Sequence, residues 1–527
     1  MTPQSPTPIT LLARPRRMSL LRDPAHSLAT LPYDMLAYIT PYLDFADVRN
    51  LSLVSKHLHS MIPVHLSRLN CTTPEGLRNL EAYLYFNIPD RAPRLLSLTL
   101  HLNAHAKSFD ELSVNQDLAK GIIRILTVTQ QLRELRLVFD PVSPTPRWFR
   151  GQPRFLEAIG NLPRLTTLYS SLMRQGANNT SIYPSSLREL HLAQGGHSKC
   201  SIADLSRALS HVTALETIVL EDTTLRDWDL YIIQGTSTLH TLPSVKTLQL
   251  ISTELLYSSA LAFPNVFPNL STLCLVYCSY RLDIHATQTQ EKISFPSLHH
   301  ISIANAFRDI CLPFVANRLT IVMGDKTSGY SVTTVSSPRV GLTLKTPLSQ
   351  WHLSTYIDTR YRWLELESDR PNLNWIMSHL VSSLLPLSVT NDSQPMILII
   401  AQASLLRQPR PHSPLMCLSI LAPGSNLQSQ NEGVDEETRD LFLRTVADCF
   451  PRLEYIALAA PRWTNMQRED DHTGERGPWR WWRVIWSAAG IPEEIQKFPA
   501  WEGERVRDYL RCADVDAMDK FAGTLSR

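Results

Sequence analysis

A short hydrophobic phrase recurs along most of the chain. A leucine-like residue is followed three positions later by a second and two positions after that by a third, as in Leu187, Leu190 and Leu192. In a β-strand the last two of these residues point to the same side, so each copy predicts a short strand with one apolar face. The copies open at Leu95, Leu132, Leu187, Leu215, Val245, Leu270, Leu298, Leu415 and Leu453.

The spacing of these copies predicts a repeat array. From Leu187 onward the openings lie 28, 30, 25 and 28 residues apart, and helical patterns such as 202–209 fall between them. A proline often stands two positions before the opening residue, where it does not interrupt a strand ladder. One strand cannot bury its apolar face alone, whereas stacked units can. The sequence therefore predicts an α/β fold, a solenoid with a parallel concave sheet and helices outside.

A small or polar residue usually stands three positions after each phrase. In leucine-rich repeats this position is Asn or Cys, which hydrogen-bonds the backbone where the strand ends. The phrase, its interval and this position together resemble degenerate leucine-rich repeats. The residues at this position are Asn103, Asp140, Gly195, Thr223, Thr253 and Cys278.

Residues 31–62 follow a different, helical pattern. Met35, Ile39 and Leu43 share one helix face, and Asp44 is suited to cap a second helix that buries Val48. Apolar residues then continue at helical spacing from Leu51 through Val54 and Leu58 until Pro63. Because ~40 residues is the usual lower limit for an unaided fold, we expect this segment to pack on something else.

The same segment resembles the F-box. The resemblance is carried by Leu31-Pro32, Asp34, Leu36, Ile39, Leu43, Asp47-Val48, Leu51 and Val54-Ser55-Lys56. It implies a three-helix unit that docks on the small Skp adaptor of cullin-RING ubiquitin ligases, while the rest of the chain selects a protein substrate. The adaptor-binding residues that it implies are Leu31, Pro32, Met35, Leu36, Ile39, Leu43, Val48, Leu51, Val54, Ser55 and Lys56.

Composition adds constraints on the partner and the compartment. The 527 residues carry a formal net charge of +2, which gives no electrostatic case for nucleic acid. No apolar run approaches ~18 residues, so no membrane span is expected. The 8 cysteines are spread over the whole length, which favours reduced thiols and a cytoplasmic or nuclear protein.

No residue pattern indicates catalysis, a cofactor or a metal site. The sequence has no phosphate-binding glycine loop, and Cys274 and Cys278 lack a second pair of zinc ligands, so we interpret them as structural. Glu365, Glu367 and Asp369 alternate along one strand face, which we interpret as a solvated edge. We therefore expect a protein that is not an enzyme.

The predicted domains follow from these patterns. Residues 1–26 form a disordered basic, proline-rich tail, with a transit peptide as the alternative. Residues 27–63 form the F-box and 64–94 a helical linker. The solenoid spans 95–465, with insertions near 325–347 and 405–437. Residues 466–527 form a loop and a tryptophan-rich cap that seals the last repeat with its arginines in solvent; nucleic-acid binding by these tryptophans is the alternative.

Residues that alternate with the buried leucines face the concave side of a solenoid. Charges gather in the early copies, whereas the face from Thr217 to Val276 is mostly neutral, which suits a polypeptide partner. The candidate substrate-binding residues are Glu134, Arg136, Glu189, His191, Thr217, Val219, Thr247, Gln249 and Thr272.

These patterns predict a non-catalytic substrate-recognition subunit of an SCF-type ubiquitin ligase. Its expected partners are the Skp-family adaptor, through it a cullin-RING ligase, and an unidentified protein substrate, with no nucleic acid and no membrane. The alternative is a repeat-type scaffold that binds the adaptor without a role in the ligase.

Overall fold

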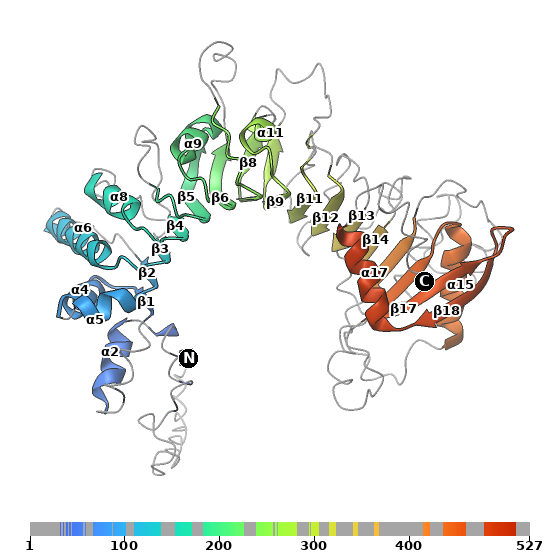
Figure 1. The fold of residues 1–527 in the computed structure, drawn as a ribbon, viewed down its shortest axis with the longest axis horizontal. Helices are drawn as coiled ribbons and strands as arrows, with labels where there is room; N and C mark the ends of the chain where they lie inside the picture. Colours follow the sequence, from blue (N-terminus) through green and yellow to red (C-terminus); the bar gives the residue numbers. More distant parts are fainter. Residues whose placement is uncertain are drawn as a thin grey trace, which may run out of the picture. The chain divides into compact units, whose positions relative to one another are not determined.

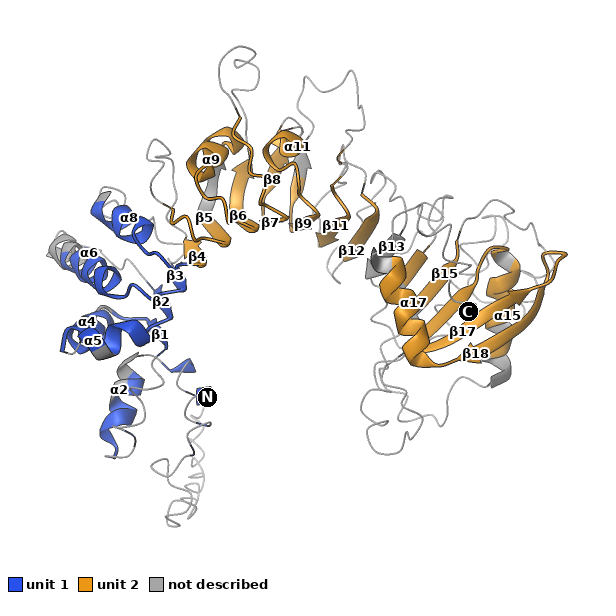
Figure 2. Ribbon diagram, in the orientation of Figure 1, with its two compact units in different colours: residues 1–165 blue, residues 166–527 orange. Residues whose placement is uncertain are grey.

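The structure is a computed structural model of the chain, and it divides into two compact units, Met1–Leu165 and Thr166–Arg527 (Figure 2). The residues that it describes are 32, 35, 38–39, 42–43, 45–55, 58, 67–86, 88–101, 110–138, 153–170, 183–225, 239–256, 259–260, 262–281, 295, 297–304, 316–322, 341–345, 363–367, 415–421, 436–459 and 479–512. The predicted basic tail lies outside them.

Unit 1 builds a short parallel ladder, β1–β2–β3, with helices between its strands (Figure 1). Leu98 and Leu100 of β2 align with Leu135 and Leu137 of β3, and all four are buried. The described elements are α2 (Phe45–Leu53), β1 (Arg68–Cys71), α4 (Pro74–Phe86), α5 (Ile88–Arg91), η5 (Ala92–Arg94), β2 (Ser97–His101), α6 (Asp110–Val128), β3 (Glu134–Val138) and α8 (Pro153–Gly160).

The ladder begins earlier than the sequence analysis predicted. The interval 64–94 contains strand β1, which pairs in parallel with β2, as well as helix α4. Leu69 and Cys71 supply the buried pair of this strand. The hydrophobic phrase is incomplete at this strand, because Cys71 stands where the last leucine would be.

Unit 2 continues the same architecture over a longer ladder. Its parallel order is β4–β5–β6–β7–β9–β11–β12–β13–β14–β15–β16, and β17 and β18 then follow in antiparallel pairing (Figure 1). Its first elements are β4 (Thr167–Ser170), β5 (Glu189–Cys200), α9 (Ile202–Leu209), β6 (Thr217–Leu225), β7 (Thr247–Ile251), β8 (Glu254–Leu256), α11 (Phe263–Val266), β9 (Thr272–Val276), β10 (Ser279–Arg281) and β11 (His300–Ala304). The later ones are β12 (Arg318–Val322), β13 (Gly341–Lys345), β14 (Trp363–Glu367), β15 (Cys417–Leu421), α15 (Glu436–Cys449), β16 (Tyr455–Ala459), β17 (Trp479–Trp486), β18 (Pro492–Phe498) and α17 (Ala500–Cys512).

This arrangement confirms the α/β class, the parallel sheet and the repeat solenoid. The paired apolar residues of each described repeat, such as Leu190 and Leu192 or Leu248 and Leu250, are buried between sheet and helices. In β4, Ser170 takes the place of the last leucine of the phrase. Its side chain is buried there, so the strand keeps the repeat geometry although its phrase is incomplete.

Strands β12, β13 and β14 also lack the complete phrase in the sequence. They keep the apolar pair two residues apart, as in Leu319 and Ile321, but not the leucine that opens the phrase; before β12 this position is Ala316. β13 also lies inside the predicted insertion 325–347, so the parallel ladder passes through that interval without a break.

The strand ends of unit 2 carry a repeated turn. Asp222 lies within β6, and Ser252 and Tyr277 directly follow β7 and β9; the three residues have positive φ angles of 52°, 48° and 54°. The next residue is buried each time, and its side chain hydrogen-bonds backbone carbonyls. Thr253 Oγ1 lies 2.9 Å from the Ile251 oxygen and 3.3 Å from the Leu220 oxygen of the preceding repeat. The side chain at this position thus hydrogen-bonds backbone where the strand ends, as the resemblance to leucine-rich repeats implied, and at Thr253 it also joins two neighbouring repeats.

Cys278 occupies the equivalent position one repeat later. Its thiol lies 3.2 Å from the Leu250 oxygen, and burial raises its pKa to about 11. The thiol thus stays protonated and able to donate, in keeping with a structural cysteine. A second linkage starts from the residue after the recurrent proline, because Asn269 Nδ2 and Ser297 Oγ donate to the Pro243 and Pro268 oxygens of the preceding repeats at 2.8 and 2.7 Å.

The Thr253 linkage can be tested by Thr253→Val, which keeps the shape of the side chain and removes the hydroxyl. We expect the free energy of unfolding to fall by about 1–2 kcal/mol, since buried carbonyls lose their donor. Thr272→Val is the matched control, because Thr272 lies half-exposed on the concave face. Urea unfolding followed by circular dichroism measures both, and equal midpoints would contradict a role for Thr253 in joining repeats.

Candidate binding faces

The open concave face of unit 2 consists of three rows of side chains that cross strands β5 to β12. Strand register defines each row, and alternation along the strands sets the rows apart from the buried leucines. Row one is Glu189, Thr217, Thr247, Thr272, His300 and Arg318. Row two is His191, Val219, Gln249, Cys274, Ser302 and Thr320, and row three is Ala193, Glu221, Ile251, Val276, Ala304 and Val322.

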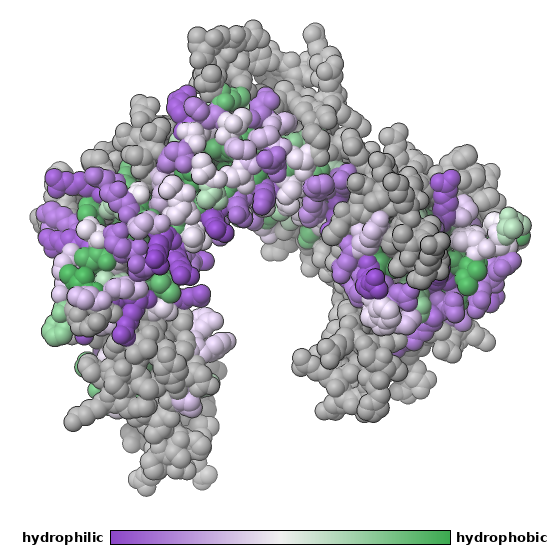
Figure 3. Space-filling view, in the orientation of Figure 1, coloured by the Kyte–Doolittle hydropathy of each residue, from purple (hydrophilic) through white to green (hydrophobic). Residues whose placement is uncertain are grey.

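Seven of the candidate substrate-binding residues lie together in the first two rows: Glu189, His191, Thr217, Val219, Thr247, Gln249 and Thr272. Most are half-exposed, and Glu189 is exposed. Val219 is only 6% exposed, so of these residues it offers a partner little contact area. The surface over strands β5 to β12 is a mixture of hydrophilic and hydrophobic side chains (Figure 3).

A polar cluster joins three neighbouring strands at one side of these rows. His191 Nε2 lies 3.0 Å from Glu221 Oε2, and the Tyr169 and His191 rings meet edge to face with centroids 4.2 Å apart. Hydrogen bonds from His191 and Tyr169 and the charge of His191 lower the pKa of Glu221 against the opposing effect of burial. Glu221 therefore carries its negative charge at neutral pH.

At the other side of the rows the charge is positive. The Arg318 guanidinium lies 5.0 Å from the ring centroid of Trp363. His300 Nε2 lies 2.9 Å from Thr320 Oγ1, and burial together with Arg318 lowers the pKa of His300 to about 4. At neutral pH, His300 is uncharged and Arg318 is the cation of this end.

Further along the sheet the concave face is covered. Trp363, Cys417, Ser419, Tyr455 and Ala457 occupy the concave-side positions of β14, β15 and β16, and all are buried. Helix α17 lies over this region and contacts β17. A Cβ added at Gly503 would lie 2.1 Å from Trp481 Cγ, so only glycine lets the helix come this close.

The Glu365 side chain holds this helix to β14. Arg507 donates from Nη2 to Glu365 Oε1 at 3.0 Å and from Nε to Glu365 Oε2 at 3.3 Å. The two side chains are 14% and 5% exposed, respectively. Glu365 therefore does not lie on a solvated edge, and that prediction was wrong. Of the arginines of the C-terminal cap, which were expected in solvent, Arg505 is exposed, whereas Arg507 is not. The tryptophans divide, with Trp481 and Trp482 buried and Trp501 exposed.

In unit 1 the two remaining candidates, Glu134 and Arg136, pair with each other. Arg136 Nε lies 2.6 Å from Glu134 Oε1, and Ser97 Oγ donates to Glu134 Oε2 at 3.0 Å. Glu134 and Ser97 lie in register on β3 and β2. Both carboxylate oxygens of Glu134 are thus already hydrogen-bonded within the unit.

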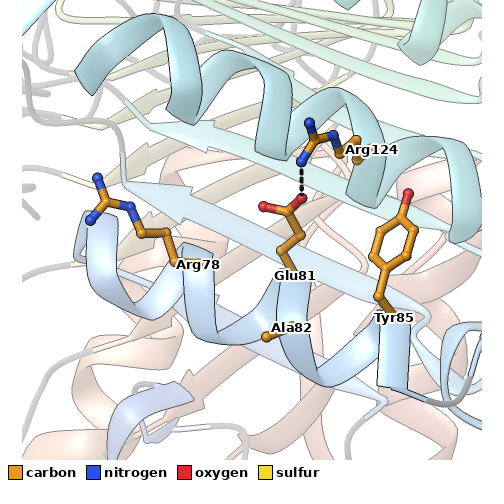
Figure 4. A pocket seen from close by; sticks show the side chains of 5 residues that line it. All are labelled: Arg78, Glu81, Ala82, Tyr85 and Arg124. Carbon is orange, nitrogen blue, oxygen red and sulfur yellow. Dashed lines mark hydrogen bonds and ion pairs between the residues drawn. The ribbon is translucent and has the colours of Figure 1, made fainter. Parts of the chain in front are cut away.

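A pocket of about 560 Å³ opens between α4 and α6 of the same unit (Figure 4). It is lined by Arg78, Glu81, Ala82, Tyr85 and Arg124. Arg124 Nη1 lies 2.8 Å from Glu81 Oε1, and a Cβ on Gly121 would approach Glu81 Oε2 to 3.0 Å. The carboxylate is therefore engaged in holding the two helices together. Sequence patterns gave no sign of this pocket because its residues come from two separate repeats.

The described residues of the F-box-like segment include two buried apolar side chains and several exposed ones. Val48, only 1% exposed, and Leu58 are buried, and α2 contacts α4 and β1. The burial of Val48 agrees with the buried side predicted for this helix, and its predicted contact with an adaptor stays a prediction. Met35, Leu53 and Val54 are 47%, 68% and 61% exposed.

The other predicted adaptor-binding residues vary in placement. Pro32 is exposed, and Ile39, Leu43, Leu51 and Ser55 are half-buried, whereas Leu31, Leu36 and Lys56 lie outside the described residues. α2 begins at Phe45, directly after the expected cap Asp44, but it ends at Leu53 rather than continuing through Val54. Directly after this end, the Ser55 hydroxyl accepts a hydrogen bond from the Leu58 amide at 3.1 Å, as a helix N-cap residue does.

None of the described helices combines the length and apolar character needed to cross a membrane. Within the described ranges, no three His, Cys, Asp or Glu side chains gather as a metal site would require.

The geometry defines the class of protein as an α/β repeat solenoid with a parallel sheet. No family model matches the sequence, and no curated protein matches it. Among solved structures, a leucine-rich-repeat protein of Leptospira interrogans is similar at 15% identity and a TM-score of 0.25, covering 75% of this chain and 96% of that one.

The buried ion pair predicts that Arg507→Met strongly destabilises unit 2. Removing one partner leaves Glu365 uncompensated, so we expect a loss of about 3 kcal/mol in the free energy of unfolding. Arg505→Met is the control on the same helix, because Arg505 is exposed. The double variant Glu365→Met with Arg507→Met should recover much of the loss; equal effects of Arg505→Met and Arg507→Met in thermal unfolding would contradict the pair's role.

His300 predicts a sensitivity to acid. Its folded pKa of about 4 lies below the ordinary 6.5, so the unfolded chain binds the proton first as the pH falls. Stability is therefore lost between about pH 6.5 and 4, by up to ~1.4 kcal/mol per pH unit for one proton. Denaturation curves across this range should show a shallower pH dependence for His300→Gln than for the wild type, and parallel curves would rule this out.

Proposed function

We propose that the protein is a non-catalytic substrate-recognition subunit of an SCF-type ubiquitin ligase. The N-terminal segment docks on the Skp adaptor, and the solenoid binds a protein substrate on the open rows of its concave face. The observation that carries this proposal is the F-box-like sequence with exposed apolar side chains at Met35, Leu53 and Val54 on a segment that is anchored by Val48 and Leu58. An adaptor that covered these side chains would remove their apolar surface from water, which is favourable.

The solenoid supports the substrate-binding half of the proposal. Rows one to three offer hydroxyls, aliphatic groups and a few charges, and this mixed composition is typical of protein interfaces. A phosphate backbone would require a dense positive surface, whereas the described rows include Glu189 and Glu221.

Replacing Leu31 and Pro32 together by alanine should release the adaptor. We expect copurification of the adaptor and cullin with the tagged full chain to fall at least tenfold, since the two residues start the F-box-like pattern. The solenoid should keep its thermal unfolding midpoint. Phe86→Ala is the control, because Phe86 is also an exposed apolar residue of unit 1 but lies on α4, outside the segment.

A second variant separates the two binding activities. Thr247→Arg with Gln249→Arg places two charges in the open rows and should weaken substrate capture while the adaptor still copurifies. An adaptor that stays bound to the Leu31 and Pro32 variant would overturn the proposal. Copurification of the adaptor without cullin would instead favour a scaffold with no ligase role.

A further inference from the structure

We propose that the open rows of unit 2 bind an amphipathic α-helix of the partner, lying across strands β5 to β12 with its N-terminus toward Arg318. This inference rests on the proposed function and specifies the class of substrate segment. Its evidence is the arrangement of charge and apolar surface on the three rows and the way the same sheet binds α17.

The rows differ in chemistry along their length. Row one offers three threonines between Glu189 and Arg318, while row three offers an aliphatic stripe beyond Glu221. The stripe is half-exposed on four successive strands, and Tyr277, 44% exposed, stands at the end of one of them. Its residues are Ile251, Val276, Ala304 and Val322. A ligand with one polar and one apolar side would match both rows at once.

The dimensions of the rows suit a helix. Rows one and three are four residues apart along each strand, about 13 Å, and an α-helix with its side chains is ~10–12 Å wide. A helix lying over row two would therefore touch row three with its apolar side and row one with its polar side. Five strand spacings from Glu189 to Arg318 amount to about 24 Å, or ~16 helical residues.

The charges fix the polarity of the ligand. Glu189 and the ionised Glu221 lie at the β5–β6 side, and Arg318 lies at the β12 side with His300 uncharged. Complementary charges place basic residues of the ligand near the glutamates and acidic residues near Arg318. Acidic side chains favour the N-terminus of a helix and basic ones its C-terminus, so the dipole of a helix supports the same direction.

An extended peptide fits these strands less well. Strands β6, β7, β9 and β11 are hydrogen-bonded on both sides, so their face offers no backbone edge to which a peptide strand could add. A helix satisfies its own backbone. The protein itself already places a helix on this side of the sheet, since α17 packs Gly503 on Trp481 of β17 and reaches Glu365 of β14 through Arg507.

The test is selection from a displayed library of 20-residue peptides randomised at every position, using the purified full chain without the adaptor. We expect the recovered helices to share an apolar stripe at 3.6-residue spacing, acidic residues in the first turns and basic residues in the last. Synthetic copies of them should bind Val276→Asp at least tenfold more weakly than the wild type.

Charge variants provide the second measurement. Glu189→Lys should weaken the recovered helices about fivefold at low salt, whereas Glu216→Lys, which changes an exposed carboxylate outside the rows by the same charge, should not. Circular dichroism checks that each variant is folded. Recovery of extended, proline-containing sequences, or of helices that bind wild type and Val276→Asp equally, overturns the inference. Copurification of the adaptor with the same variants tests the proposed function separately, so the two failures are distinguishable.

Discussion

Burial of paired apolar residues between successive repeats is the interaction on which the structure depends. A single strand with Leu248 and Leu250 cannot exclude water, but each described repeat covers the apolar side of the next. The side chains of Thr253, Cys278 and Asn269 then satisfy carbonyls of the preceding repeat, so the close stacking leaves few backbone groups without partners. The first and last repeats of such an array have no neighbour on one side, so their apolar faces must be covered in another way.

The far end of unit 2 ends with a change of strand direction. β17 runs antiparallel to β16, and β18 follows it as the outermost strand of the described ladder. Glu493, Glu494 and Lys497 are exposed on β18, and charges on an outer strand disfavour pairing with another chain. In unit 1, α2 contacts β1, the first described strand. The F-box-like segment thus gains its packing surface from the repeats, as its short length led us to expect.

The sequence predicted the strands that carry the full hydrophobic phrase, and with them the parallel sheet and the concave positions. It did not predict β1 and β12, where Cys71 and Ala316 replace a leucine, because a shortened phrase is common in any chain. The alternating acidic pattern also led to the wrong prediction that Glu365 lies on a solvated edge. The partner Arg507 lies 142 positions away, and alternating acidic residues on a strand look the same whether or not a distant helix covers them. Local periodicity contains information about local structure and register, but not about which face a remote segment will occupy.

The α17 helix makes one continuous sheet present two different surfaces. The close approach of Gly503 to Trp481 supplies apolar contact, which is strong but imprecise in position. The Glu365–Arg507 pair adds little net stability, since both charges lose their hydration, but any shift of the helix would leave a buried carboxylate unpaired. The ion pair therefore fixes where on the face α17 lies. Because α17 is held over β14 to β17, strands β5 to β12 keep their concave side chains accessible to a partner. The covered surface and the accessible surface meet where the Arg318 guanidinium lies over the Trp363 ring.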